Sequence, residues 1–396
     1  MFYVRDGLCG SWSIIVFGYS MLKSNIVITV PEGLCPFLKT EVESLGLPVT
    51  SVTPTSLSTE GASTEAMLLN LRLRTGHHVL FQIAAFRCRD ADELYKELSK
   101  ILWETIIPSD EYLTVVSNVR NPTIRDARFA NMRCKDAIVD RIQARKGRRP
   151  DSGPEQTGAV VSLYWRDERC TVYLDTSGEP LSRRGYRRIP LGAPMQETLA
   201  AGVVMASELK AGDSFVNPMC GSGTMAIEAA LSLSGRVPGL TRQNFGFMHL
   251  LGFDMRAWEE MKAAAKGKVL KTVPSQIIAT DNNEKAIEAA RKNAATAGVE
   301  QLIRFEVCDY ADTPVPPPPG AVILNPAYGM RLGDDKELVE TYRGIGAFFK
   351  QKCKGYRGGV FTANTGLAGQ VGLKAKRKVP FVNGKIECRL YVYDLY

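Results

Sequence analysis

Ser214-Phe-Val-Asn-Pro-Met-Cys-Gly-Ser-Gly-Thr224 is the stretch that decides the fold. A short apolar run up to Val216 leads into Gly221 and Gly223, and residues 224–232 have the pattern of a helix. Glycine has no Cβ, so the backbone at such a turn can come close to a ligand. A strand that runs through a glycine-rich turn into a helix is typical of nucleotide-type sites in α/β sheets. The stretch therefore predicts the first strand–turn–helix unit of such a sheet.

Alternating strands and helices continue downstream of this unit. The pattern predicts strands over 277–280, 303–307 and 321–324, and helices over 284–297 and 337–351, with Asn283 as an N-cap and Gly298 at a C-terminal turn. Such alternation is typical of a mostly parallel, doubly wound sheet. Asn383-Gly384, between the apolar runs 379–382 and 388–393, predicts a final antiparallel hairpin. That hairpin separates methyltransferase-like sheets from ordinary dinucleotide folds.

Acidic residues follow the next two predicted strands. Asp281 suits a ribose diol, because a carboxylate accepts hydrogen bonds from both hydroxyls. Asp309 could accept from an adenine amino group. The glycine turn also loosely matches the dinucleotide fingerprint, which expects its acid about 20 residues on, whereas Asp281 lies much further away after an insertion. The ordered set fits S-adenosylmethionine.

Asn325-Pro-Ala-Tyr328 follows the fourth predicted strand. The amide oxygen of Asn325 could accept one N–H of a planar amine, and the carbonyl of Pro326 the other. Tyr328 could stack on the ring, which is worth about 1–3 kcal/mol for a nucleobase. Asn-Pro is also a common turn starter. This motif comes fourth, after the glycine turn and the two acids. Its position favours an enzyme that methylates a base amine, because an enzyme that transfers hydride would not need a site for an amine there.

Two segments, 217–230 and 325–332, together resemble the THUMP-domain RNA guanine methyltransferases, which methylate the exocyclic 2-amino group of guanosine. Further matches are 123–126, 135–140, 174–178, 184–187 and 194–200. The resemblance covers residues 25–396 and is closest to the bacterial enzymes that act on 23S, large-subunit ribosomal RNA, without the second methyltransferase that can be fused to them. Two departures are Asn217, where the family usually has Asp, and Ala327, where it usually has a second proline. Because alanine removes a φ restraint, we expect slower transfer rather than a different reaction.

The resemblance implies an α/β architecture in which small modules precede the catalytic domain. We expect an extension over 1–24 that is disordered, a ferredoxin-like module over 25–85, a THUMP RNA-binding domain over 86–178 and a Rossmann-like methyltransferase domain over 190–396. It implies catalytic roles for Asn325, Pro326 and Tyr328. It also implies cofactor contacts from Glu197, Thr198, Asn217, Pro218, Gly221, Gly223, Thr224, Asp281, Asn282, Asp309 and Asn325.

Basic residues are concentrated in one segment of the predicted RNA-binding half. Residues 120–149 contain ten Lys or Arg and three Asp. Arg133, Arg141 and Arg145 have the spacing of neighbours on one helix face, which could meet phosphates or simply be solvated. The second basic cluster, 183–188, could contact RNA or pair with acids. The RNA-binding candidates are Arg125, Arg133, Lys135, Arg141, Arg145, Arg184 and Arg187.

The N-terminal part has the mixed pattern of small α+β modules. We expect strands over 25–30, 67–73 and 79–86, helices over 35–45 and 90–103, and a hairpin of 160–164 with 171–174. In the insertion after the first catalytic-domain helix, Phe245 and Phe247 could line a base pocket or belong to the core.

The amino-acid composition indicates which kinds of partner and which cellular compartment are plausible. The net charge of +8 over 396 residues makes an anionic partner plausible. Nine scattered cysteines, an odd number, favour reduced thiols and a cytoplasmic protein, and no metal site or membrane helix is expected. The sequence therefore predicts S-adenosylmethionine-dependent methylation of guanosine in ribosomal RNA. Alternatives are methylation of transfer RNA, methylation of an adenine amine, and an inactive RNA-binding or assembly protein; the oligomeric state stays open.

Overall fold

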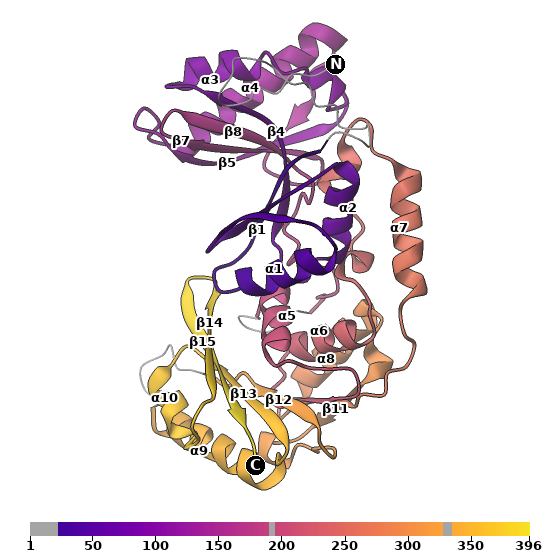
Figure 1. Cartoon of the computed structure of the whole chain (residues 1–396), viewed down its shortest axis with the longest axis vertical. Coiled ribbons are helices and arrows are strands. Elements are labelled where there is room, and N and C mark those ends of the chain that lie inside the picture. Colours follow the sequence, from indigo (N-terminus) through magenta and orange to yellow (C-terminus); the bar gives the residue numbers. More distant parts are fainter. Residues whose placement is uncertain (1–22, 190–194, 328–334) are drawn as a thin grey trace. The chain divides into compact units, whose positions relative to one another are not determined.

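The computed structural model describes residues 23–189, 195–327 and 335–396 (Figure 1). The chain forms two compact units. The N-terminal unit comprises residues up to Val30, Lys39–Leu181 and Arg242–Ala263, and the C-terminal unit comprises Pro31–Leu38, Ser182–Thr241 and Ala264–Tyr396. The predicted extension over 1–24 lies almost wholly outside the described residues.

The N-terminal unit is built on one eight-stranded sheet. Its strands are β1 (Ser24–Thr29), β2 (Val49–Thr53), β3 (Ser56–Gly61), β4 (His78–Arg87), β5 (Tyr112–Arg120), β6 (Asp151–Ser152), β7 (Ala159–Arg166) and β8 (Arg169–Asp175), in the order β2-β3-β1-β4-β8-β7-β5-β6. The long strand β4 pairs antiparallel with β1 and with β8, so the ferredoxin-like and THUMP modules share this sheet. The predicted β7–β8 hairpin is confirmed.

Helices cover this sheet. They are α1 (Cys35–Ser44), α2 (Ser63–Arg72), α3 (Ala91–Leu98) and α4 (Ala127–Lys146), with the short 3₁₀ turn η1 (Trp103–Thr105). In Figure 1, α3 and α4 lie together on one side of the THUMP strands. The N-cap of α3 is Asp90, whose carboxylate accepts from the backbone N–H groups of Asp92 and Glu93.

The strand predicted over 67–73 is wrong, because residues 67–72 belong to α2 and Leu73 is its C-cap. The segment is rich in Met, Leu and Ala, which are strong helix formers. Its start is also fixed locally, since the Glu65 carboxylate accepts a 2.7 Å hydrogen bond from the backbone N–H of Ala62. The apolar run was short enough to fit a buried strand or a buried helix, and the capping contact decides for the helix.

The C-terminal unit contains a seven-stranded, mostly parallel sheet. Its strands are β9 (Ser214–Asn217), β10 (Ile277–Asp281), β11 (Ile303–Val307), β12 (Gly320–Leu324), β13 (Tyr356–Thr362), β14 (Arg377–Asn383) and β15 (Ile386–Asp394), in the order β11-β10-β9-β12-β13-β15-β14. Only the final hairpin runs antiparallel to its neighbours within this described sheet. The predicted fold class is confirmed, including the antiparallel end.

Helices flank the C-terminal sheet. They are α5 (Glu197–Ala206), α6 (Thr224–Leu233), α8 (Glu284–Ala297), α9 (Asp335–Lys352) and α10 (Thr365–Gln370), with the 3₁₀ turns η2 (Pro238–Thr241), η4 (Glu300–Leu302) and η5 (Tyr310–Asp312). Figure 1 places α9 and α10 together beside β13, away from α6 and α8. Tyr342, Phe348 and Phe349 of α9 are buried in the core with residues of β12, β13 and β15. Asn283 caps α8 as predicted, and Gly298 ends it in a left-handed conformation, φ 71°.

The segment 242–263 packs with the N-terminal unit, although it lies inside the range predicted for the catalytic domain. It contains the 3₁₀ turn η3 (Gly246–His249) and the first part of α7 (Met255–Gly267). Phe245 and Phe247 are fully buried and stack at 5.2 Å between ring centroids, with Trp258 packed edge-on against both. Of the two interpretations left open for these phenylalanines, the structure shows core packing.

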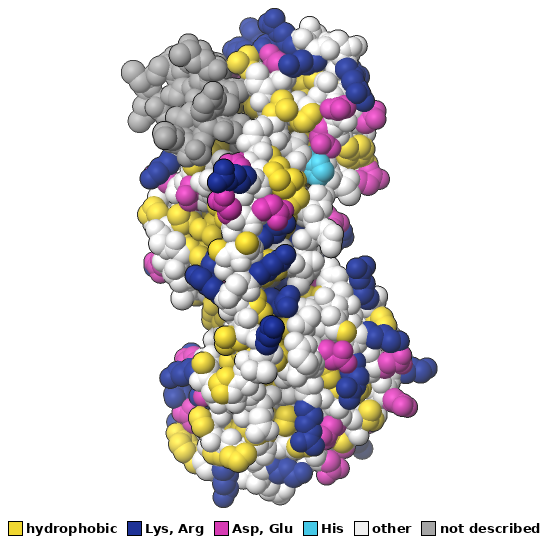
Figure 2. Space-filling model, turned by 90° about the vertical axis from the view of Figure 1, so that its right-hand side faces the viewer, with side chains coloured by type: hydrophobic (Ala, Val, Ile, Leu, Met, Phe, Trp, Pro, Cys, Tyr) yellow, Lys and Arg dark blue, Asp and Glu magenta, His cyan; other side chains and the backbone are white. Residues whose placement is uncertain are grey.

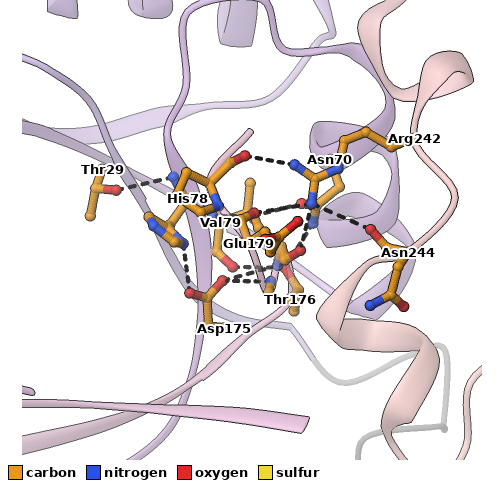
Figure 3. A network of polar contacts seen from close by, with 12 residues as sticks. Thr29, Asn70, His78, Val79, Asp175, Thr176, Glu179, Arg242 and Asn244 are labelled. Atoms are coloured by element: carbon orange, nitrogen blue, oxygen red, sulfur yellow. Dashed lines mark hydrogen bonds and ion pairs between the residues drawn. The ribbon is translucent and has the colours of Figure 1, made fainter. Parts of the chain in front are cut away.

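A buried polar network closes the end of the N-terminal sheet (Figure 3). Asp175, at the end of β8, lies 2.7 Å from the imidazole of His78 and accepts from the backbone N–H groups of Ser177 and Gly178. The Asn70 amide bonds the hydroxyls of Thr176 and Ser177. Arg242 donates to the carbonyls of 177, 179, 180 and 244. The polar side chains of the matched motif 174–178 form hydrogen bonds within the N-terminal unit, so we interpret the motif as a structural one.

Candidate cofactor and base site

A cavity of about 480 Å³ opens at the carboxyl ends of β9, β10 and β12. Ligands of doubly wound sheets bind at this edge, and the size lies within the range of roughly 300–1,000 Å³ for small-molecule sites. The cavity is lined by Met219, Asp281, Asn282, Asp309, Tyr310, Asn325, Pro326, Ala327, Glu337, Leu338 and Thr341. The structure thus brings together five predicted site residues: Asp281, Asn282, Asp309, Asn325 and Pro326. It adds Tyr310 and a face of α9 that the sequence did not indicate.

The glycine turn after β9 is held in left-handed backbone conformations. Met219, Gly221 and Gly223 have φ of 55°, 55° and 81°. A Cβ on Gly223 would lie 2.8 Å from the Cβ of Ala290 in α8, so this glycine permits close packing of the turn on that helix. At Gly221 a Cβ would meet nothing within 4 Å, so glycine is needed there for its φ.

Asp281 ties the glycine turn to the next strand. Its carboxylate accepts from the backbone N–H of Gly221 at 2.9 Å and from that of Asn283 at 3.0 Å. A carboxylate offers about four lone-pair sites, so two remain for a diol. Asp309 is exposed at the cavity and accepts from the backbone N–H of Ala311 at 2.9 Å. Both carboxylates line the cavity, and their contacts with ribose and adenine stay predictions.

Asn217 connects the cofactor turn to the strand that carries Asn325. Its side-chain N–H donates a 2.9 Å hydrogen bond to the carbonyl of Ile323 in β12, and the residue is fully buried. An aspartate could not donate this bond. The departure from the usual Asp at this position therefore supplies a brace between two strand ends, and no charge is needed for it.

Arg187 lies beside the start of α6 and the start of α5. Its guanidinium donates to the carbonyl of Met195 and to the hydroxyl of Thr224, and stands 3.5 Å from the Glu197 carboxylate. Only 15% of the Arg187 side chain is exposed. Burial raises the pKa of Glu197, against the opposing charge of Arg187. These contacts place Arg187 with two predicted cofactor residues, Glu197 and Thr224, rather than on an RNA-facing surface.

Four buried polar atoms of the catalytic domain have no hydrogen-bond partner among the described residues: Arg187 Nε, Thr198 Oγ1, Asn217 Oδ1 and Asn325 Oδ1. A buried polar group without a partner costs about 1–3 kcal/mol, so each of these atoms is a candidate for a ligand contact. Of the four residues, Asn325 lines the cavity. The set contains one charged donor, one hydroxyl and two acceptors. Such a set fits a polar, zwitterionic cofactor and an amine-bearing acceptor.

Arg184 was predicted to bind RNA, and the structure contradicts this. Its side chain is 1% exposed, and it forms a 2.8 Å ion pair with the equally buried Glu228 of α6. The Tyr186 hydroxyl donates to the same carboxylate at 2.9 Å. A charge paired in this way cannot reach phosphate, because leaving the pair would strand Glu228 inside the core.

Some basic residues in and just before α4 pair with acids, and others are exposed to solvent. Arg133 pairs with Asp92 and lies over the ring of Tyr95, and Arg141 forms a two-bond pair with Glu104. That pairing lowers the pKa of Glu104, although burial opposes it. Arg125 and Arg145 are exposed, whereas Lys135 is partly buried beside Asp136. Figure 2 shows Lys and Arg side chains at the top of the view, interrupted by single acids.

We also searched the described part of the chain for reactive cysteines, metal ligands and membrane-spanning helices. Its eight cysteines are free, and burial raises the pKa of Cys220 beside the glycine turn, so its thiolate is disfavoured. Residues 23–189, 195–327 and 335–396 contain no cluster of three His, Cys, Asp or Glu side chains suited to a metal. Among their helices, none combines the length and apolarity of a membrane span. The predicted ring contact of Tyr328 lies outside the described residues.

The sheet order, the glycine turn and the strand-end acids define a methyltransferase. The chain belongs to the family described as "RMKL-like, methyltransferase domain", whose pattern matches residues 184–392. A THUMP domain matches 88–175, and the ferredoxin-like domain described for RlmL matches 25–80.

Similar proteins carry RNA-modifying names. A ribosomal RNA large subunit methyltransferase K/L of Syntrophotalea carbinolica is 36% identical over 93% of this chain and 53% of its own length. The chain spans about half the length of the K/L relatives that it matches. A putative RNA methyltransferase of Synechocystis is 30% identical over 93% of this chain and 96% of its own length. The crystal structure of SMU.472, a putative methyltransferase complexed with SAH, has a TM-score of 0.84 at 27% identity and covers 94% of this chain and 98% of its own.

Proposed function

We propose that the chain transfers a methyl group from S-adenosylmethionine to the exocyclic 2-amino group of a guanosine in large-subunit ribosomal RNA. The observation that carries this proposal is Asn325, which lines the cavity and whose buried Oδ1 accepts no hydrogen bond from the described residues. An amide oxygen in that state favours a ligand that donates a hydrogen bond, and an amine N–H is such a donor. The family membership, the K/L relatives and the neighbour that holds SAH support the methyltransferase part.

The described residues fit the cofactor. S-adenosylmethionine supplies a methyl group on a positively charged sulfur. We assign Asp281 to the ribose hydroxyls and Asp309 to the adenine amine, because both carboxylates line the cavity with acceptor capacity to spare. Arg187 and Thr198 offer unpaired donor atoms for a carboxylate, and Glu197 offers an acceptor for an ammonium group.

Asn325 and Pro326 would act on the acceptor base. Asn325 Oδ1 and the Pro326 carbonyl accept the two N–H groups of the amine, which orients the nitrogen lone pair for attack on the methyl carbon. Positive charge develops on the nitrogen during transfer, and two fixed acceptors stabilise that charge more than the neutral ground state. Holding the reactants at contact distance supplies much of the remaining acceleration. The surplus proton leaves to water, and Tyr328 stays a prediction as the stacking residue.

An RNA substrate follows from the N-terminal unit. THUMP modules bind RNA, and exposed cations such as Arg125 and Arg145 suit phosphates. The target base must be flipped or unpaired to enter the cavity. The names of the K/L relatives favour ribosomal RNA over transfer RNA, and a ribosomal substrate would place the enzyme in the cytoplasm. An amide and a carbonyl do not themselves distinguish a guanine amine from an adenine amine.

The substrate is tested by deleting the gene in the source organism. Mass spectrometry of its ribosomal and transfer RNA should show the loss of one N2-methylguanosine from large-subunit RNA. Loss of a methylguanosine from transfer RNA would identify transfer RNA as the substrate instead, and loss of a methyladenosine would identify adenine as the methylated base. Unchanged RNA, together with no calorimetric binding of S-adenosylmethionine, would favour the inactive RNA-binding alternative.

The site is tested by Asn325→Ala. Removing one preorganised charge-stabilising group typically slows catalysis by about 10²–10³-fold. We expect a loss of this size in transfer to ribosomal RNA, with binding of S-adenosylmethionine changed no more than a few fold. Gln301→Ala, an exposed amide change in the same unit, is the control. Wild-type rates in the Asn325 variant would overturn the role of this residue.

A further inference from the structure

The N-terminal unit contains a second pocket, which the proposed reaction does not use. A cavity of about 340 Å³ lies between α4, β5 and the loop that follows β6. It is lined by Leu113, Val115, Arg128, Asn131, Met132, Lys135, Ser152, Gly153 and Pro154. The pocket lies wholly within one compact unit.

Its helix side is one face of α4. Residues 128, 131, 132 and 135 are spaced by three, four and seven positions, which places them on one side of a helix. This face is distinct from Arg133 and Arg141, which pair with acids of α3 and η1. Met132 is 48% exposed, while Leu113 of β5 is fully buried. The pocket therefore has an apolar floor and an open mouth with a flexible, polarisable side chain beside it.

One polar atom of the pocket residues lacks a partner. The Oδ1 atom of Asn131 is buried and accepts no hydrogen bond from any described residue. An unsatisfied buried amide oxygen is unfavourable, so it favours an occupant that brings an N–H. Every nucleobase presents at least one N–H on its pairing edge when it is unpaired.

The rim carries positive charge. Helix α4 contains six Lys or Arg and two Asp. Arg128 pairs with Asp126, and Lys135 with Asp136. The Arg128 pair is exposed and the Lys135 pair is partly buried. Exposed ion pairs are weak, so phosphate can compete most readily for Arg128. The charge of the rim suits an anionic polymer better than an apolar peptide.

The opposite wall is held in place. A Cβ on Gly153 would lie 2.0 Å from the Tyr112 hydroxyl, which itself hydrogen-bonds the carboxylate of Glu155. The Thr114 hydroxyl donates to the carbonyl of Glu155 at 2.7 Å. These contacts fix the loop against β5, so the pocket exists before any ligand arrives.

We propose that this pocket binds one unpaired nucleobase of the RNA substrate. Asn131 Oδ1 accepts an N–H of the base, Met132 packs on the ring, and Arg128 with Lys135 hold the flanking phosphates. This second contact deepens the proposed function, on which it rests for the identity of the partner. It lets the enzyme recognise an unpaired nucleotide away from the one it methylates.

The test uses the full-length protein and a fluorescein-labelled single-stranded RNA hexamer of mixed sequence, followed by anisotropy. Asn131→Ala and Met132→Ala should each weaken binding by about 5-fold or more, in line with roughly 1–3 kcal/mol for a seated base. Gln143→Ala, an exposed amide on the same helix, and Met255→Ala, an exposed methionine of the same unit, are the matched controls and should bind like wild type. Ser152→Trp, on the exposed rim, should block the mouth without disturbing the core.

A second probe distinguishes the contribution of the bases to binding from that of the sugar-phosphate backbone. A hexamer of ribose phosphates without bases should bind wild type as weakly as it binds Met132→Ala. Equal affinity of wild type for the intact and base-free hexamers, or wild-type affinity in the three pocket variants, would overturn the proposal. So would displacement of the RNA by an uncharged apolar hexapeptide, which would indicate a peptide site.

Calorimetry with S-adenosylmethionine and methylation of ribosomal RNA are measured in parallel. Pocket variants that bind RNA normally while wild type methylates would refute only the second pocket. Base-dependent binding without any methylation would refute the proposed function and leave the pocket standing.

Discussion

Unpaired buried atoms identify the site more sharply than residue types do. Asn217 and Asn325 each have an Oδ1 atom without a partner among the described residues, but of the two only Asn325 lines the cavity. Asn217 donates its side-chain N–H to the carbonyl of Ile323 and so connects two strand ends. A similar comparison separates Arg184, which is paired in the core, from Arg187, whose Nε lacks a partner among the described residues.

Glu197 should make cofactor binding depend on pH. Burial raises the pKa of its carboxyl, so the group is neutral below that raised value and ionised above it. The ionised form attracts the ammonium and sulfonium of S-adenosylmethionine. Affinity should therefore be full at pH 8 and fall as the pH drops through the raised pKa, by at most about tenfold per pH unit.

Calorimetry between pH 8 and pH 5 checks this prediction. Glu197→Gln should bind more weakly at pH 8 and lose the pH dependence. Glu260→Gln, an exposed change on α7, should keep the wild-type profile. A wild-type affinity that stays flat across this range would contradict the assignment.

Arg184 should matter for stability and not for RNA. Arg184→Met leaves the buried Glu228 carboxylate without its cation, which typically costs about 3–5 kcal/mol. Urea unfolding should show that loss, and the double variant Arg184→Met with Glu228→Met should regain much of it. The exposed neighbour change Arg183→Met is the control. A loss below about 1 kcal/mol in Arg184→Met would show that the pair is dispensable.

At the scale of elements, the glycine turn combines two constraints that one substitution pair can separate. Gly221→Ala should lower the free energy of unfolding by about 1–2 kcal/mol, because alanine disfavours the left-handed φ of this position. Gly223→Ala has the same φ penalty and also presses its new Cβ against Ala290 of α8. This overpacking should lower the free energy of unfolding by about 1–3 kcal/mol more. Urea unfolding should therefore rank Gly223→Ala as the less stable variant.

The clash can be relieved from the other side. Gly223→Ala combined with Ala290→Gly should recover the overpacking part of the loss but not the φ part. If the double variant is no more stable than the sum of the two single losses predicts, the contact between the turn and α8 is not the cause.

Elements with strong local signals were predictable from sequence. β11 and α8 have the expected bounds, because Asn283 and Gly298 mark the helix ends and the strand has a clear apolar pattern. β13 was missed, since Gly358 and Gly359 have low strand propensity; here they allow close packing on Leu395, Leu390 and Ile323. Arg184 was misassigned because the residues of a basic cluster do not themselves indicate which of them pairs with a buried acid.

At the scale of the whole molecule, the two compact units do not follow the order of the chain. Residues 242–263 belong to the N-terminal unit, although they follow the first helix of the catalytic sheet. Arg242 donates to three carbonyls just after β8, and the backbone N–H of Phe247 donates to Thr176. The Leu251 N–H donates to the carbonyl of Ile106 at 2.8 Å. A family boundary drawn near residue 180 therefore does not coincide with a folding boundary.

A fragment that ends at Leu181 should consequently fail to fold stably. It lacks Phe245, Phe247 and Trp258, which are at most 1% exposed. Burying each ring is worth about 1.5–3 kcal/mol, so their loss removes an amount comparable to the total stability of a domain, about 5–15 kcal/mol. Residues 23–181 should give a poorly dispersed ¹H–¹⁵N spectrum. The same fragment with 242–263 attached through a Gly-Ser linker should give a dispersed spectrum, and a version carrying Phe245→Ser and Phe247→Ser should revert to the first. A well-dispersed spectrum for residues 23–181 alone would show that the inserted segment is an accessory of the unit rather than part of its core.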